Sequence, residues 1–324
     1  MTRVLLHVGL PKTGTTALQN EVFPKIAGID YLGPKGAVGL DDRRGVAGNL
    51  VIEALKHRTR PLAEGEIGPR VRRARDWLRR LDGTLLLSEE GLTSNSRARV
   101  LGYDPVPLMP AAIRTLLPEA EIVLVLREPT DWVASMLLQR MWDWPTYVRG
   151  PRGDRPLGPK ACVDHDLALA ARGANRSIFG TMARFDRMLA AYRAAFPSAR
   201  VHVLAYERLF GPDEGWRAAF ACLLGVPVDG PSPPRVNESS DDKRRNIAER
   251  FFPLPGEAGK VERFVAAWRG LGAVLRRHPA AQAFLEAHAV GPWRAAMAAG
   301  ATGSPSPLPL LGEGLDATRR GSGE

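Results

Sequence analysis

A glycine-rich segment near the N-terminus has the residue types that bind phosphate through the main chain. Residues 5–16 read LLHVGLPKTGTT, so an apolar run leads into a turn with Gly9 and Gly14 and then into Thr15 and Thr16. Four residues separate the two glycines, as in the phosphate-binding loop of nucleotide-binding proteins. The main-chain amides of such a turn, and the start of the helix behind it, point toward an anion.

The lysine of this segment is not where a nucleoside-triphosphate site needs it. In that site a lysine directly follows the second glycine, whereas here Thr15 has that position and Lys12 lies inside the turn. The spacing therefore favours a loop that binds one phosphate and one further tetrahedral anion over a triphosphate–magnesium site. A P-loop kinase or NTPase stays open as the alternative, and Glu89 or Glu90 would then have to bind the magnesium ion.

A second candidate anion site follows a later apolar run. The strand predicted over 121–127 places Arg127 at its carboxyl end, and Ser135 lies two turns into the next predicted helix. Ligands of open α/β sheets bind at the carboxyl ends of strands, and an arginine can bind a phosphate through two parallel hydrogen bonds. Together the two side chains can hold a second, separate phosphate. Taken alone, Arg127 fits a strand-end ion pair equally well, and Ser135 fits an ordinary helix position.

The two segments together resemble a known enzyme family. PKTGTT at 11–16 and VLREPTDWVASML at 125–137 are similar to the cofactor signatures of sulfotransferases, which use 3′-phosphoadenosine 5′-phosphosulfate (PAPS). The resemblance implies a P-loop NTPase-like sulfotransferase fold and the transfer of a sulfuryl group to a hydroxyl or amine, with no metal. It extends to PRVNESS at 234–240, which looks like a late segment of bacterial members.

The resemblance also implies roles for individual residues. The first loop would hold the 5′-phosphosulfate, and Lys12 would contact the bridging oxygen of the departing phosphate. Arg127 and Ser135, which lie eight residues apart as in the family, would hold the 3′-phosphate. The cofactor-binding residues implied in this way are Pro11, Lys12, Thr13, Gly14, Thr15, Thr16, Arg127 and Ser135.

Sulfuryl transfer needs a base, because the acceptor loses a proton as its bond to sulfur forms. The predicted strand 84–88 is followed by Glu89 and Glu90, and successive side chains of a strand point to opposite sides. One carboxylate should therefore face the cleft, and resemblance to a Ser-x-Glu-x-Leu pattern of bacterial members favours Glu90. Glu89 as the base and a solvent-exposed acidic pair both stay open. His7, two residues before Gly9, is the competing base, although a packed strand histidine is its more common role.

The alternation of short apolar runs with helical patterns predicts an α/β fold with an open parallel sheet flanked by helices. Four near-continuous apolar runs predict strands buried on both faces, at 4–8, 84–88, 121–127 and 200–205. Helical patterns precede or follow them at 15–23, 70–81, 131–144 and 184–196.

The second half of the chain predicts a helical C-terminal part. Helical patterns cover 241–252 and 257–277 and continue to about residue 299. We expect a single domain over 1–299. The Gly-, Pro- and Ser-rich stretch 300–324 has the composition of a disordered tail.

Composition limits the function classes. The 324 residues are 44% hydrophobic and 25% charged, which is typical of a globular protein. The net charge of +10 favours an anionic partner, although an arginine-rich genome gives the same excess. Charge alone suggests nucleic acid, and no recognised motif supports it, so no nucleic-acid partner is expected. Two cysteines exclude a disulfide framework.

No apolar run approaches the length of a membrane span, and no signal peptide is recognisable, so a cytoplasmic enzyme is expected. The acceptor stays open between a small molecule and a carbohydrate. We expect its pocket in the loops around 27–65 and 145–180, and the oligomeric state is not predicted. Lys243, Arg244 and Arg245 could contact an acidic glycan, or they could form a solvated helix face.

Overall fold

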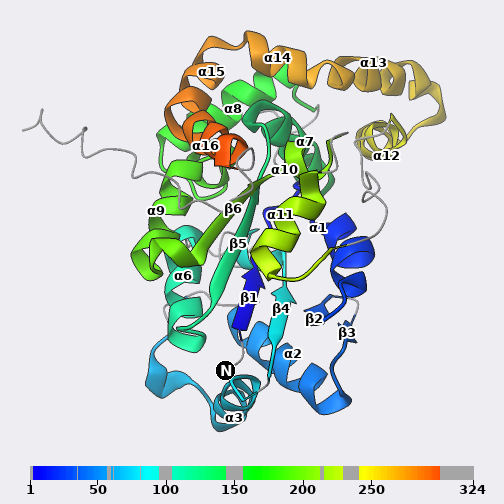
Figure 1. The fold of residues 1–324 in the computed structure, drawn as a ribbon. Helices are drawn as coiled ribbons and strands as arrows, with labels where there is room; N and C mark the ends of the chain where they lie inside the picture. The colour runs from blue at the N-terminus through cyan, green and yellow to red at the C-terminus, as the bar shows by residue number, and fades with distance from the viewer. Residues whose placement is uncertain are drawn as a thin grey trace, which may run out of the picture.

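The structure is a computed structural model that describes residues 3–34, 36–56, 60, 62–80, 82–94, 104–143, 156–211, 215–228 and 241–299. Its centre is a six-stranded sheet with the strand order β3-β2-β4-β1-β5-β6 (Figure 1). All neighbouring strands run parallel except β2 and β3, which form an antiparallel hairpin. The strands are β1 (Arg3–His7), β2 (Ile29–Gly33), β3 (Gly36–Val38), β4 (Thr84–Ser88), β5 (Glu121–Leu126) and β6 (Val201–Ala205).

Helices connect and flank these strands. The helices before β6 are α1 (Thr15–Ala17), α2 (Asp42–Lys56), α3 (Pro69–Leu78), α4 (Gly91–Ser94), α6 (Pro105–Leu116), α7 (Pro129–Asp143), α8 (Pro159–Ala171) and α9 (Phe185–Ala195). Those after β6 are α10 (Tyr206–Leu209), α11 (Gly215–Leu224), α12 (Asp241–Phe251), α13 (Ala258–Arg269), α14 (Leu271–Arg277), α15 (Pro279–Leu285) and α16 (Gly291–Ala299).

The α/β prediction is confirmed, and the four predicted strands are present within one residue of their expected ends. The sheet is mixed rather than wholly parallel, because β2 and β3 add an antiparallel edge that the sequence analysis read as part of a loop over 27–65. β3 has three residues, and β2 (IDYLG) includes an aspartate and a glycine, so neither has the continuous apolar run that marks the central strands.

The central strands β1, β4 and β5 are buried on both faces, as predicted, because their alternate residues enter two different hydrophobic clusters. The fourth predicted strand, β6, is only partly buried over its middle three residues. Leu6 and Leu87 belong to a large cluster with α2, α6 and α7. Leu5 and Leu86 belong to a second cluster with Phe23 and with Phe220 of α11. The sheet is thus held between two helical layers, which fixes the position of its carboxyl edge.

The segment that follows the glycine-rich turn is helical but not uniform. After α1 it continues as a π-helical turn over Leu18–Val22 and a 3-10 turn over Phe23–Lys25. A single helix over 15–23 was expected. Pro24 has no amide hydrogen to donate, which is consistent with the change of hydrogen-bond pattern at the end of this segment.

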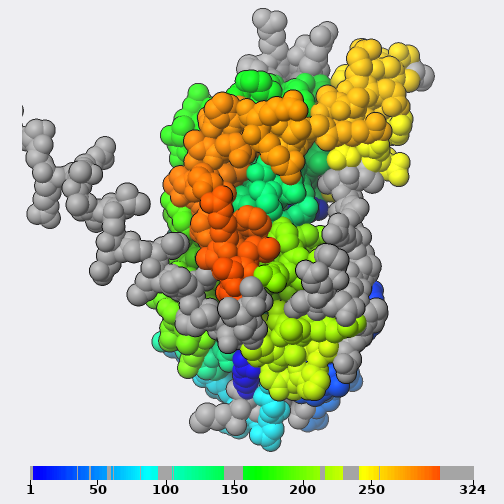
Figure 2. All heavy atoms as spheres, turned by 45° about the horizontal axis from the view of Figure 1, so that its top comes forward, coloured from blue at the N-terminus to red at the C-terminus, as the bar shows by residue number. Residues whose placement is uncertain are grey.

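The C-terminal helices lie beyond the end of the sheet toward which β1 points (Figure 1). The helix α14 packs against α7 and α8, while α12 packs against α7 and α16 against β6. With the top of Figure 1 turned forward, Figure 2 shows these helices, in yellow to red, covering part of that face. The helical C-terminal prediction is confirmed, except that the helix expected over 257–277 is interrupted at Gly270.

Several sequence features lie outside the described residues. They are residues 145–155 of the loop expected around 145–180, the PRVNESS segment at 234–240 and the expected tail at 300–324. The expectations of a single domain over 1–299 and of a disordered tail stay predictions.

Candidate active site

The turn between β1 and α1 is held in place through its carbonyl groups. The four consecutive carbonyls of residues 9–12 each accept a hydrogen bond from a side chain. The donors are Thr93 Oγ1 to residue 9 (2.5 Å), Thr13 Oγ1 to residue 10 (2.6 Å), Trp132 Nε1 to residue 11 (2.7 Å) and Arg127 Nη1 to residue 12 (3.1 Å). These bonds join the turn to α4, β5 and α7, so its main-chain path is fixed before any anion binds.

Two residues of this turn have left-handed backbone conformations. Lys12 has a φ of 66° and is the one described residue other than glycine with a positive φ, and Gly14 has a φ of 76°. A left-handed lysine is strained by about 1–2 kcal/mol, and such strain concentrates at ligand sites. Turns of this kind can direct successive amides toward one point and thereby form an anion-binding concavity.

Both glycines of the motif are needed for steric reasons. A Cβ at Gly14 would lie 2.3 Å from the ring of Phe210, and a Cβ at Gly9 would lie 2.6 Å from Thr15 Oγ1. Thr13 and Thr15 are buried, and both hydroxyls donate to the carbonyl of residue 10. Among the predicted loop residues, the two threonines therefore support the turn with their hydroxyls and can meet an anion only through their amides.

Arg127 and Ser135 meet beside this turn, as the sequence predicts. Arg127 Nη1 lies 3.5 Å from Ser135 Oγ and donates to the carbonyl of Lys12. The guanidinium also lies 4.8 Å from the ring centre of Tyr206, which stacks on Phe210 with ring centres 4.6 Å apart. Arg127 is thus oriented by a hydrogen bond and by an aromatic face, and it links the two predicted anion sites.

A cavity of about 430 Å³ opens beside Arg127 and Ser135. Its other walls come from α12, α13 and α14, which contribute Arg244, Arg269 and Arg276. Arg269 and Arg276 were not predicted, because no local sequence pattern shows that helices so far along the chain approach Arg127. Arg244, which could have been a solvated helix residue, contributes to this basic cavity.

Acidic side chains partly balance these arginines. Asp131 accepts a hydrogen bond from Arg276 at 2.5 Å, and Asp241 pairs with both Arg244 and Arg269. The cavity lining carries four arginines and one aspartate, so it stays positive and suits an anionic ligand.

Glu207, in α10, is a supporting residue of this site. Its Oε1 accepts a hydrogen bond from the amide of Glu128 at 2.8 Å, directly after Arg127. Its Oε2 accepts another from Trp293 Nε1 of α16 at 2.9 Å. Glu128 in turn accepts from the amides of Thr130 and Asp131 and so caps α7. The C-terminal helix is thereby connected to the turn that carries Arg127.

The two neighbouring carboxylates after β4 have different environments. Glu89 is buried, forms an ion pair with Lys56 Nζ at 3.2 Å and accepts from the amide of Gly91 at 2.9 Å. The pKa of Glu90 is raised to about 7, chiefly because the carboxyl is buried; the charge of Lys12 opposes this shift, and the charge of Glu89 adds to it. The pKa of Glu90 therefore depends on the charge of the loop lysine, and the carboxyl can exchange a proton near neutral pH.

His7 lies wholly in the interior. Burial lowers the pKa of His7 to about 3, so the ring is neutral at physiological pH. Nδ1 is 2.8 Å from Ser88 Oγ, and the ring packs edge-on against Phe23 with ring centres 5.3 Å apart. Within the described part of the chain, Nε2 has no hydrogen-bond partner. These contacts are those of a packed strand residue.

Neither a family model nor a curated protein matches the chain. One similar solved structure is a sulfotransferase from Alicyclobacillus acidocaldarius. The identity is 20%, the match covers 83% of this chain and 99% of that chain, and the TM-score is 0.39. At this identity and TM-score the likeness assigns no activity to this chain.

Two further observations concern the described residues only. No three His, Cys, Asp or Glu side chains among them are grouped in a way that could hold a metal ion. None of their helices combines the length and the apolar character needed to cross a bilayer.

Proposed function

We propose that this chain is a sulfotransferase that moves the sulfuryl group of PAPS to a hydroxyl or amine of an acceptor. The observation that carries the proposal is the hydrogen bond by which Arg127, of one predicted anion site, is joined to the loop of the other. Arg127 donates to the carbonyl of Lys12 and lies beside Ser135, so one arginine joins the 5′-phosphate loop to the candidate 3′-phosphate site. A nucleotide with phosphates at both positions would contact both sites at once.

In this proposal Lys12 and Glu90 have complementary tasks. Lys12 would stabilise the negative charge that grows on the bridging oxygen as the bond from sulfur to the departing phosphate breaks. Glu90 would accept the proton of the acceptor as the new bond to sulfur forms, and a pKa of about 7 suits a base that works near neutrality. The products would be the sulfated acceptor and adenosine 3′,5′-bisphosphate.

The other candidate bases are less well placed. Glu89 is engaged by Lys56 and by the amide of Gly91, and the interior position of His7 keeps its ring from solvent. The same contacts weaken the kinase alternative. Thr15 stands where the triphosphate lysine would be, and a threonine cannot supply the cation that reaches the β- and γ-phosphates.

Nucleotide binding tests the proposal directly. Isothermal titration should give tighter binding of adenosine 3′,5′-bisphosphate than of AMP or magnesium ATP. Arg127→Ala should reduce the ratio of the dissociation constants for AMP and the bisphosphate about 10- to 100-fold. This is the effect expected for charge-assisted hydrogen bonds of about 1.5–3 kcal/mol.

Arg200→Ala is the matched control for this experiment. Arg200 also donates to a main-chain carbonyl, that of Pro118, but at the opposite end of the sheet. It should leave the preference unchanged. Equal binding of the bisphosphate and AMP by the wild-type protein would refute the assignment of the 3′-phosphate site.

The partner expected for this activity is an acceptor of low molecular weight or a carbohydrate. A cytoplasmic location and the absence of a nucleic-acid partner belong to the same proposal.

A further inference from the structure

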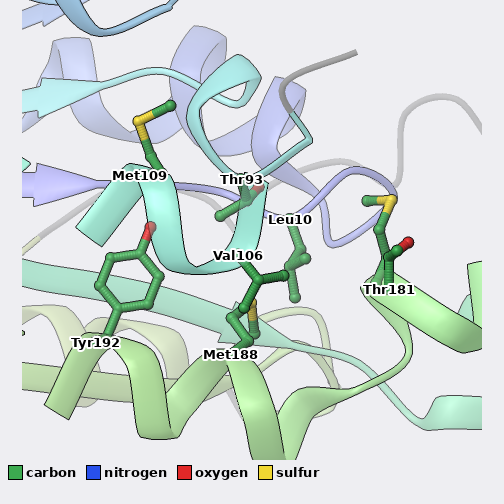
Figure 3. A pocket seen from close by; sticks show the side chains of 8 residues that line it. Leu10, Thr93, Val106, Met109, Thr181, Met188 and Tyr192 are labelled. Carbon is green, nitrogen blue, oxygen red and sulfur yellow. The ribbon is translucent and has the colours of Figure 1, made fainter. Parts of the chain in front are cut away.

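A second cavity borders the Lys12 turn at Leu10 (Figure 3). It shares no lining residue with the arginine-lined cavity beside Ser135. Its walls come from the turn itself, from α4, α6 and α9 and from the π-helical turn Ile178–Met182. We call it the methionine pocket, and the residues that define it here are Leu10, Thr93, Met109, Met182, Met188 and Tyr192.

The position of the methionine pocket connects it with the proposed reacting groups. Leu10 lies two residues before Lys12 in the turn. Thr93, three residues after Glu90, donates its hydroxyl to the carbonyl of Gly9 at 2.5 Å. The pocket therefore borders both the loop that carries the lysine and the segment that carries the carboxyl. Lys12 and Glu90 do not line the pocket themselves, and a molecule seated there would lie against the two segments that carry them.

The lining of the methionine pocket is uncharged and mostly apolar. Thr181 is buried, and its hydroxyl is engaged by the carbonyl of Ser177 at 2.6 Å. The hydroxyl of Thr93 is engaged as well. A sugar would leave most of its hydroxyls without partners against such a wall, and an unpaired buried hydroxyl is costly. The wall favours an apolar body.

One residue of the pocket lining, Tyr192, has a buried polar group. Tyr192 is 2% exposed, and within the described residues its hydroxyl has no hydrogen-bond partner. Figure 3 shows this hydroxyl turned toward Met109 on the facing wall. Buried hydroxyls are normally paired, so an unpaired one in a cavity wall indicates a partner that binds there.

The pocket is narrow in this conformation, with about 10 Å³ of room for the centre of a water molecule. Three of its wall residues are methionines, whose unbranched side chains can take up other rotamers at low cost. A ligand would enter by displacing these thioethers, so a flat or slender group fits best.

We propose that the methionine pocket binds the apolar body of the sulfate acceptor, and that the acceptor is an uncharged aryl or alkyl alcohol with a second polar atom at its far end. This inference rests on the proposed sulfotransferase function. The acceptor oxygen would form the bond to sulfur and lose its proton to Glu90. The bond from sulfur to the bridging oxygen would break, and its electron pair would stay on the phosphate of adenosine 3′,5′-bisphosphate.

The first test compares acceptors. The probes are 2-naphthol, 2,6-dihydroxynaphthalene and methyl β-galactoside, with transfer of labelled sulfate from PAPS as the activity and titration calorimetry in the presence of adenosine 3′,5′-bisphosphate as the binding measurement. Both naphthols should bind and be sulfated, and the galactoside should do neither. The second hydroxyl should lower the dissociation constant about 2- to 10-fold, the effect of one neutral hydrogen bond. Tyr192→Phe should abolish that difference.

A second test blocks the pocket. Val106, on α6, is a half-buried lining residue, so Val106→Phe can add volume without unfolding the core. It should weaken 2-naphthol binding at least 10-fold. Val71→Phe, at a half-buried position on α3 outside the pocket, should not. Both variants should bind adenosine 3′,5′-bisphosphate like the wild type.

The outcomes separate the two proposals. Normal nucleotide binding with sulfation of the galactoside and not of the naphthols would overturn the acceptor assignment alone. Naphthol binding that Val106→Phe and Val71→Phe affect equally would overturn it too. Failure of the wild-type protein to bind adenosine 3′,5′-bisphosphate would refute the sulfotransferase function, and the acceptor assignment with it.

Discussion

Replacing Glu90 with glutamine should leave the protein nearly inactive and at the same time more stable. Glutamine keeps the size of the side chain and most of its hydrogen-bonding reach, but it cannot accept the acceptor's proton. Loss of a general base lowers turnover by about 10²- to 10⁴-fold. Binding of adenosine 3′,5′-bisphosphate should persist in Glu90→Gln, because the carboxyl acts on the acceptor side of the turn.

The stability effect follows from the direction of the pKa shift. Burial raises the pKa of Glu90 from an ordinary 4.5 to about 7 in the folded protein. The folded state therefore holds a proton that the unfolded state has lost between these two pH values, and the free energy of unfolding falls as pH rises through this window. Above pH 7 the ionised carboxyl costs up to about 3 kcal/mol, which a neutral glutamine does not.

Two pH series test this reasoning. Chemical unfolding should show no difference between Glu90→Gln and the wild type at pH 4, and an increasing advantage for the variant up to about pH 7. In the wild type, kcat/KM should rise about tenfold between pH 6 and pH 8, as a base with a pKa near 7 becomes ionised. A variant that is equally stable at all pH values, or a flat activity profile at 6 to 8, would show that Glu90 is not the buried base described above.

The remaining predictions concern the neighbours of Glu90. Lys12→Ala should lower kcat more than it weakens binding of adenosine 3′,5′-bisphosphate, because the proposed partner of the lysine is charge that develops in the transition state; a normal kcat with only a raised KM for PAPS would assign Lys12 to plain binding. Glu89→Gln should keep kcat within about threefold of the wild type and lower the free energy of unfolding by about 1–3 kcal/mol, because it removes the charge that pairs with Lys56 and accepts from Gly91; an inactive Glu89→Gln with an active Glu90→Gln would reverse the assignment of the base.

Local patterns account for what the sequence predicted well. The central strands β1, β4 and β5 are nearly continuous apolar runs buried on both faces, so they can be predicted from those runs alone. Gly9 and Gly14 mark their turn because only glycine fits against Thr15 and Phe210. The hairpin strands β2 and β3 were missed because β2 includes an aspartate and a glycine, while β3 has three residues and is exposed along its whole length.

Parts of the site that depend on distant contacts could not be predicted. Arg127 and Ser135 lie eight residues apart on a strand end and the following helix, so their meeting follows from local geometry. Arg276 reaches the same cavity from a helix more than a hundred residues later, and no spacing rule connects them. The choice between Glu89 and Glu90 likewise depends on Lys56, whose approach from α2 is a tertiary contact.

The link from Glu207 to Trp293 has a consequence for how the proposed nucleotide site is assembled. Glu207 bonds at once to the amide that follows Arg127 and to the indole of α16. On a ribosome, the turn that carries Arg127 emerges long before this helix does, so the phosphate clamp gains its last brace only late in synthesis. Nucleotide binding should conversely slow hydrogen exchange in α16, although that helix lines neither cavity. The carboxylate of Glu207 would then contribute both to the completion of the fold and to nucleotide binding.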